Sequence, residues 1–89
     1  MEPKTAPWYP PEYEKADIRA LKNLAAGTAS PEQQQRAMKW IIERACATYD
    51  LSYRPTSDRD TSFAEGRRFV GLQIVKALKL DLAMLEKTE

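Results

Sequence analysis

Few residues in this chain could do chemistry, and their types exclude most catalytic arrangements. Histidine is absent from the 89 residues, and there is one cysteine, Cys46. The commonest general base and the commonest zinc ligand are therefore missing, and no histidine can activate Cys46. Cys46 is better interpreted as a small buried hydrophobic residue. A single cysteine also excludes an intramolecular disulfide and favours a reducing compartment.

The other candidate sites fail on spacing. Asp50, Asp58 and Asp60 share one segment, but the spacing and the glycine of a calcium-binding loop are missing. Gly66 and Gly71 lie inside a helical pattern, so they do not form a phosphate-binding loop. We therefore expect a protein without enzymatic activity, bound metal, cofactor or small-molecule substrate.

Basic side chains offer contact with nucleic-acid phosphates. Arg67 and Arg68 are followed on the same predicted helix by Lys76 and Lys79. However, 14 basic and 13 acidic residues give a net charge of only +1, and Glu65 interrupts the basic face. The preceding loop is also longer than the turn of a helix-turn-helix motif. DNA contact through these four basic residues is therefore the weaker alternative.

Three helices and an extended arm must position these residues. Prolines at positions 3, 7, 10 and 11 favour an extended arm over residues 1–11. Apolar spacing of three and four residues predicts helices over about residues 12–26, 31–49 and 62–80. A short helical tail follows, and together these elements predict a small all-α, three-helix domain over residues 12–89.

Capping residues mark the ends of the predicted helices. Gly27 ends the first helix, and Ser30 with Gln33 forms a capping box at the start of the second. Ser62 with Glu65 fits another capping box at the start of the third, although the two residues before Ser62 compete as caps.

The predicted core lies on the apolar faces of the second and third helices. It comprises Met38, Ile41, Ile42, Phe63, Val70 and Ile74. A chain of this length has a thin core and marginal stability unless it binds a partner. Leu72 projects from the polar side of the third helix, either as one stray exposed leucine or as part of a surface for a partner chain.

Large aromatic residues indicate where a partner could bind. The candidate partner-binding residues are Trp8, Tyr9, Trp40 and Leu72. The arm that carries Trp8 and Tyr9 could instead fold back over the domain's own core. Trp40 could lie flat against its neighbours or be covered by the arm.

The chain has neither an apolar run of about eighteen residues nor a secretion signal at its start. We therefore expect no membrane insertion, and a protein that works in the cytoplasm or in an assembly built there.

A set of motifs between about residues 31 and 80 resembles a family of small proteins encoded by tailed bacteriophages, often short-tailed ones, near their head and packaging genes. The shared features are an apolar helix with a small residue (Trp40 to Tyr49), a turn (Tyr53 to Pro55), and Phe63, Glu65, Gly66, Arg67 and Arg68. The resemblance implies a phage origin and lends no catalytic residues.

These patterns together predict a non-enzymatic virion or assembly component that binds phage structural proteins, copies of itself, or both. It would occupy the host cytoplasm during assembly and then the virion. A DNA-contacting packaging or regulatory factor and an inhibitor of a host protein remain the alternatives.

Overall fold

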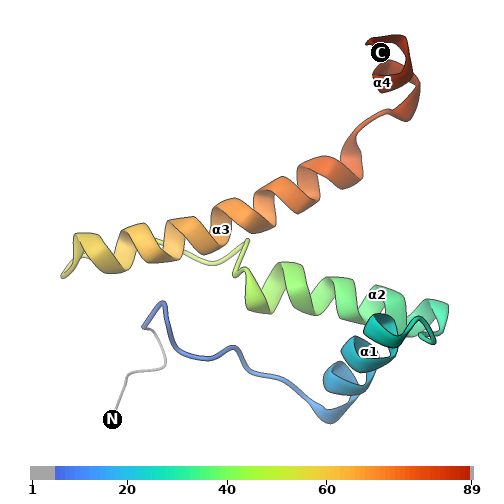
Figure 1. Cartoon of the computed structure of the whole chain (residues 1–89). Coiled ribbons are helices and arrows are strands. Elements are labelled where there is room, and N and C mark those ends of the chain that lie inside the picture. Colours follow the sequence, from blue (N-terminus) through green and yellow to red (C-terminus); the bar gives the residue numbers. More distant parts are fainter. Residues whose placement is uncertain (1–5, 89) are drawn as a thin grey trace.

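The computed structural model describes residues 6–88 and is all-α over that range (Figure 1). Its elements are α1 (Lys15–Ala26), α2 (Pro31–Trp40), the π-helical turn η1 (Ile41–Ala45), α3 (Asp58–Lys79) and α4 (Leu82–Thr88). Three main helices, an N-terminal arm and a short C-terminal helix were predicted, and this architecture is confirmed. Residues 1–5 of the predicted arm lie outside the described residues.

The α1–α2 pair forms where local capping predicts it. Gly27 ends α1 in the left-handed conformation, with φ of 77°. The Ser30 hydroxyl accepts from the Gln33 backbone N–H at 3.2 Å, and the Gln33 side chain accepts from the Ser30 N–H at 3.1 Å. Helix α1 begins at Lys15 rather than residue 12, because Glu14 is still extended. The Glu14 N–H donates to the Asp17 carboxylate at 2.8 Å.

Small residues let α1 and α2 approach closely. Ala20 and Ala37 are fully buried in this hairpin. Across its surface, Arg36 donates to Asp17 at 2.8 Å and to Glu14 at 3.4 Å. The hairpin is thus tightly packed inside, and Arg36 pairs with Asp17 and Glu14 on its surface.

The second helix ends earlier than predicted, and it ends in a wider turn. The Cys46 N–H donates to the Ile41 carbonyl at 2.9 Å, which gives the five-residue step of a π-turn. The Thr48 hydroxyl then donates to the Ile42 carbonyl at 2.6 Å. Ala47 has a φ of 48° and turns the chain away. Helical structure therefore stops at Ala45 instead of residue 49.

Helix α3 begins four residues before its predicted start. The Ser57 hydroxyl accepts from the Asp60 N–H at 3.1 Å, so Ser57 is the N-cap. Two aspartates in the first turn have the favourable sign for the helix dipole. The predicted Ser62–Glu65 capping box is wrong because both residues lie inside the helix. Glu65 instead accepts from Arg68 at 3.2 Å.

The molecule is much more open than a compact domain. Helix α3 packs against η1 and makes no contact with α1, and α4 contacts no other helix among the described residues. Figure 1 shows α3 diverging from α2 toward α4. The radius of gyration is 15.9 Å, against about 12 Å for a compact chain of this length. Among the described residues, much of α3 and α4 therefore lies away from the other helices.

The predicted core is only partly correct. Ile42 is buried, and Ile41 and Ile74 are half-buried. Met38, Phe63 and Val70 are 37%, 49% and 52% exposed. The buried residues are Ala6, Pro7, Ala20, Ala37, Ile42, Cys46, Thr48, Ala64 and Gly71. The prediction fails for α3 because this helix turns small residues, rather than its large apolar ones, toward η1.

Candidate protein-binding surfaces

The described part of the arm folds back on its own chain. Ala6 and Pro7 are buried, and a turn is closed by a hydrogen bond of 3.0 Å from the Tyr9 N–H to the Ala6 carbonyl. Tyr9 is half-buried, whereas Trp8 is 46% exposed. Of the two aromatic residues of the arm that were predicted to bind a partner, Trp8 is therefore the more accessible.

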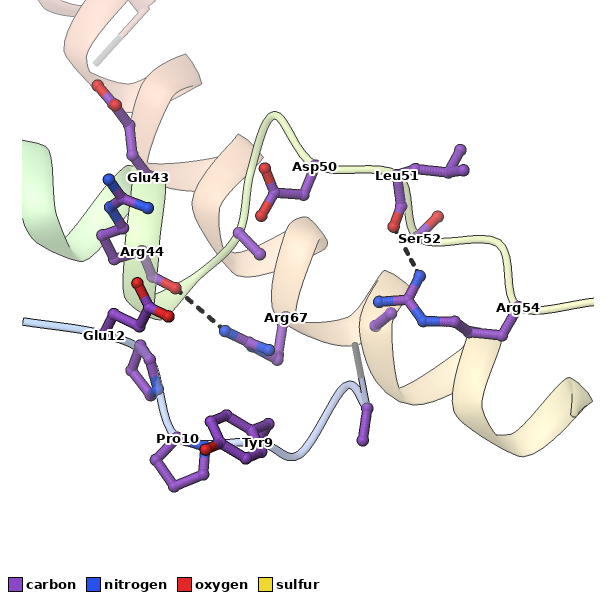
Figure 2. A pocket seen from close by; sticks show the side chains of 14 residues that line it. Tyr9, Pro10, Glu12, Glu43, Arg44, Asp50, Leu51, Ser52, Arg54 and Arg67 are labelled. Carbon is purple, nitrogen blue, oxygen red and sulfur yellow. Dashed lines mark hydrogen bonds between the residues drawn. The ribbon is translucent and has the colours of Figure 1, made fainter. Parts of the chain in front are cut away.

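Arg67 joins the arm to the end of the π-turn. Its Nη1 donates to the Pro7 carbonyl at 2.6 Å, and its Nε and Nη2 donate to the Ala45 carbonyl at 3.1 and 2.9 Å. Nη2 also donates to the Arg44 carbonyl at 3.1 Å (Figure 2). A cation at a helix C-terminus, where carbonyls lack intrahelical partners, is favourable. The sequence offered Arg67 as a possible DNA contact, whereas in the structure its guanidinium binds backbone carbonyls.

Gly71 marks the closest approach of α3 to the turn after η1. A Cβ atom at this position would lie 2.9 Å from the Cβ atoms of Cys46 and Thr48, and closer still to the Thr48 hydroxyl. Real Cβ atoms do not make such contacts, so only glycine fits. The buried face of α3, which we call the inner face, consists of Ala64, Gly71 and the half-buried Arg67.

Trp40 is covered by the segment that joins the arm to α1. Its indole Nε1–H donates to the Glu12 carbonyl at 3.0 Å, and its side chain is half-buried. Trp40 therefore stabilises the chain's own fold, as one of the alternatives for this residue anticipated. Leu72, the fourth predicted partner-binding residue, is 36% exposed on the charged side of α3.

A groove of about 580 Å³ lies between the arm, the end of η1 and the loop before α3. Figure 2 shows charged residues of both signs around it, among them Glu43, Asp50 and Arg54. The guanidinium of Arg54 donates to the Leu51 carbonyl at 2.7 Å. Arg54 and Arg67, two of the arginines at this groove, are thus used to hold backbone carbonyls. No group of three candidate metal ligands occurs among residues 6–88.

The four predicted DNA-contacting residues do not form one surface. Arg67 is directed inward to carbonyls, while Arg68 pairs with Glu65 at 3.2 Å. Lys76 and Lys79 are exposed on the same side of α3 as Arg68. A hydrogen bond from the Ser52 side chain, with help from Arg68, lowers the pKa of Glu65. This charged side of α3 therefore contains an acidic group as well as three basic ones.

The face of α3 opposite the charged side and beside the inner face is apolar and uncovered. Its residues, here called the α3 stripe, are Phe63, Gly66, Val70, Ile74 and Ala77, which recur at three- and four-residue spacing. All are exposed except the half-buried Ile74, and a Cβ atom added at Gly66 would meet nothing within 4 Å. Sequence reasoning found this face and assigned it to the core.

Further exposed apolar residues continue this surface beyond the stripe. Phe69 lies on α3, Leu80 follows its last residue, and Leu82 and Met84 lie on α4. The stripe and these residues form an apolar surface that no other helix of the described chain covers. No helix in the described part of the chain is long and apolar enough to cross a membrane.

Comparison with known proteins adds no relative to these observations. Neither a scan against protein-family models nor searches of curated proteins and solved structures find a match to this chain. The likeness to small tailed-phage proteins therefore rests on the motifs between residues 31 and 80 alone.

Proposed function

We propose that this chain is a non-enzymatic assembly protein that binds other protein chains through its uncovered helical surface. The resemblance of the motifs in residues 31–80 to small tailed-phage proteins supports a role in a bacteriophage particle or in its assembly. Phage structural proteins are the proposed partners, and the host cytoplasm followed by the virion is the proposed location.

The exposed apolar surface of α3 and α4 carries this proposal. Phe63, Phe69, Val70, Leu82 and Met84 are each about half exposed or more. Monomeric soluble proteins rarely leave contiguous apolar patches of this kind, and such patches mark sites of protein interaction. A helix that packs on no other helix of the described chain, as is the case for α4, is well suited to docking on another protein.

The inner contacts support the same role. Arg67, Gly71 and Trp40 each hold parts of the chain together. The guanidinium of Arg67 and the indole N–H of Trp40 are thus used to hold backbone carbonyls. The α3 stripe, in contrast, offers exposed apolar area to other molecules.

Quantitative mass spectrometry of purified phage particles that encode this chain tests the proposal. We expect the chain in the particle at a fixed copy number. Its absence from the particle contradicts the proposed role.

A matched pair of variants locates the contact with the particle. Leu82→Ser combined with Met84→Ser removes apolar area from α4, which no other helix contacts, so the fold should persist. We expect this variant to be lost from particles, whereas Lys76→Ser on the charged side of α3 should be retained. Retention of both variants would show that α4 does not attach the chain to the particle.

DNA contact is a second proposal, favoured only by the shared side of Arg68, Lys76 and Lys79 on α3. Three phosphate contacts would give binding that weakens as salt is raised, with a slope of about −3 in a log–log plot. Lys76→Ala with Lys79→Ala should reduce that slope to about −1. Absence of salt-sensitive binding by the unmodified chain excludes this function.

A further inference from the structure

The residues of the α3 stripe alternate in size in a way that makes the stripe complementary to itself. Phe63, Val70 and Ala77 are spaced by seven residues, so they lie nearly in line along the helix. Gly66 and Ile74 lie four residues before and four residues after Val70, about 40° to either side of it on the same apolar face. Phe63 and Ala77 are therefore equally far from Val70 in sequence, and so are Ile74 and Gly66. Each of these pairs combines a large residue with a small one.

We infer that a second copy of this chain covers the stripe, with the two α3 helices antiparallel and a two-fold axis at Val70. This inference rests on the proposed function and names one of its partners. In this arrangement Phe63 of one copy packs on Ala77 of the other, and Ile74 enters the space left by Gly66. The two Val70 side chains meet at the axis.

Packing favours the antiparallel arrangement over the parallel one. Facing positions that pair large residues with small ones fill space without strain. In a parallel pair, Phe63 would face Phe63 and Gly66 would face Gly66, which leaves the helices apart at one level and a void at the next. Glycine costs about 1 kcal/mol relative to alanine inside a helix. Nothing in the chain itself requires the glycine at position 66, but a facing Ile74 does.

The chain exposes more surface than a compact monomer of its mass. Its accessible area is 7235 Å², against about 5,300 Å² for a folded monomer of 10.2 kDa. Obligate dimers bury roughly 1,000 Å² or more on each partner, which is less than this excess of about 1,900 Å².

Arg59 lies eleven residues before Val70, so the antiparallel pairing carries it past the end of the partner's α3 at Lys79, where Leu80 is extended. The charged side of α3, with Glu65, Lys76 and Lys79, remains outside the pair.

Sedimentation equilibrium with a matched pair of variants tests the interface. The unmodified chain should dimerise, and Val70→Glu should raise the dimer dissociation constant at least about a hundredfold, because two carboxylates would be buried face to face. Leu72→Glu makes the same kind of change on the charged side and should leave the constant within about threefold. Both positions are exposed in the single chain, so circular dichroism should show unchanged helix content.

Mixing variants tests the two-fold axis. Val70→Glu and Val70→Lys should each be monomeric alone and should form a heterodimer when mixed, since opposite charges then meet at the axis. A dimer that persists in Val70→Glu, or a mixture that stays monomeric, overturns the proposed pairing.

Disulfide cross-linking tests the direction of the helices. In a Cys46→Ser background, Phe63→Cys mixed with Ala77→Cys should give a mixed disulfide, and neither variant should cross-link with itself. Cross-linking of Phe63→Cys alone indicates a parallel pair and overturns the antiparallel one.

A chain that is monomeric at every concentration but present in particles overturns the dimer and leaves the assembly role intact. A chain that dimerises but is absent from particles overturns the assembly role and leaves the dimer intact.

Discussion

Two faces of the same helix show opposite ways of using side-chain size. On the inner face, Ala64 and Gly71 are buried, and the absence of a Cβ at Gly71 allows the turn after η1 to touch the helix backbone. On the α3 stripe, Phe63 and Val70 are about half exposed. The difference teaches that large apolar residues mark a surface to be covered, whereas small ones mark where the chain covers itself.

The two glycines of α3 provide the sharpest test of this contrast. Gly71→Ala should destabilise the fold by about 3 kcal/mol or more, because its Cβ would overlap Thr48 and Cys46. Gly66→Ala should stabilise the single chain by up to about 1 kcal/mol, since the added methyl meets open space. Urea unfolding in a Val70→Glu background separates these effects from association. Equal responses at the two glycines would contradict the assignment of the faces.

Arg67 should show the next largest effect. Arg67→Met leaves the carbonyls of Pro7, Arg44 and Ala45 without their donor, and we expect a loss of about 2–3 kcal/mol. The arm should also become more accessible to proteases near Trp8. Arg68→Met, one residue away, removes only a surface ion pair with Glu65 and should change stability by less than about 1 kcal/mol. Similar losses in both variants would show that the contacts of Arg67 contribute little.

Large side chains on the stripe should matter less to the single chain than small ones on the inner face. Phe63→Ser should change the stability of the monomer by no more than about 0.5 kcal/mol, because Phe63 contributes little to the chain's own core. In the dimerising chain the same change should lower the melting temperature by an amount that grows with protein concentration. Thermal unfolding at several concentrations measures both effects. A large loss in the dilute monomer would return Phe63 to the core, where the sequence placed it.

Local signals in the sequence predicted the first half of the fold well. Gly27, Ser30 and Gln33 act through neighbours one to four residues away, so their roles can be read directly from spacing. The start of α3 was mistaken because Ser57 and Ser62 both precede apolar residues at helical spacing. What decides between them is the bond from the Asp60 N–H to the Ser57 hydroxyl, which a pattern does not reveal.

Long-range contacts account for the parts that the sequence did not predict. Arg67 binds carbonyls 22 to 60 residues away, and Gly71 meets Thr48 across the crossing of two segments. Amphipathic periodicity identifies an apolar face but does not say whether the same chain or another one covers it. The apolar face of α3 was therefore found correctly, but its large residues Phe63 and Val70 are not in the chain's own core.

Changes on the charged side of α3 should have the smallest effect on stability. This side can be compared with the inner face and with the α3 stripe. The pKa of Glu65 is lowered by a hydrogen bond from the Ser52 side chain and, to a smaller extent, by Arg68. A carboxylate with a lowered pKa in the folded state contributes stability above its unfolded pKa, and this contribution is lost as pH falls through the folded pKa. Unmodified chain and Glu65→Gln should therefore differ slightly in stability at neutral pH. Their stabilities should converge below the ordinary glutamate range of about pH 4.

Dimer dissociation should be the same for both chains at neutral pH, because the α3 stripe contains no titrating group. If Glu65→Gln changed dimerisation at neutral pH, the charged side would belong to the interface, and the two-fold axis at Val70 would be misplaced.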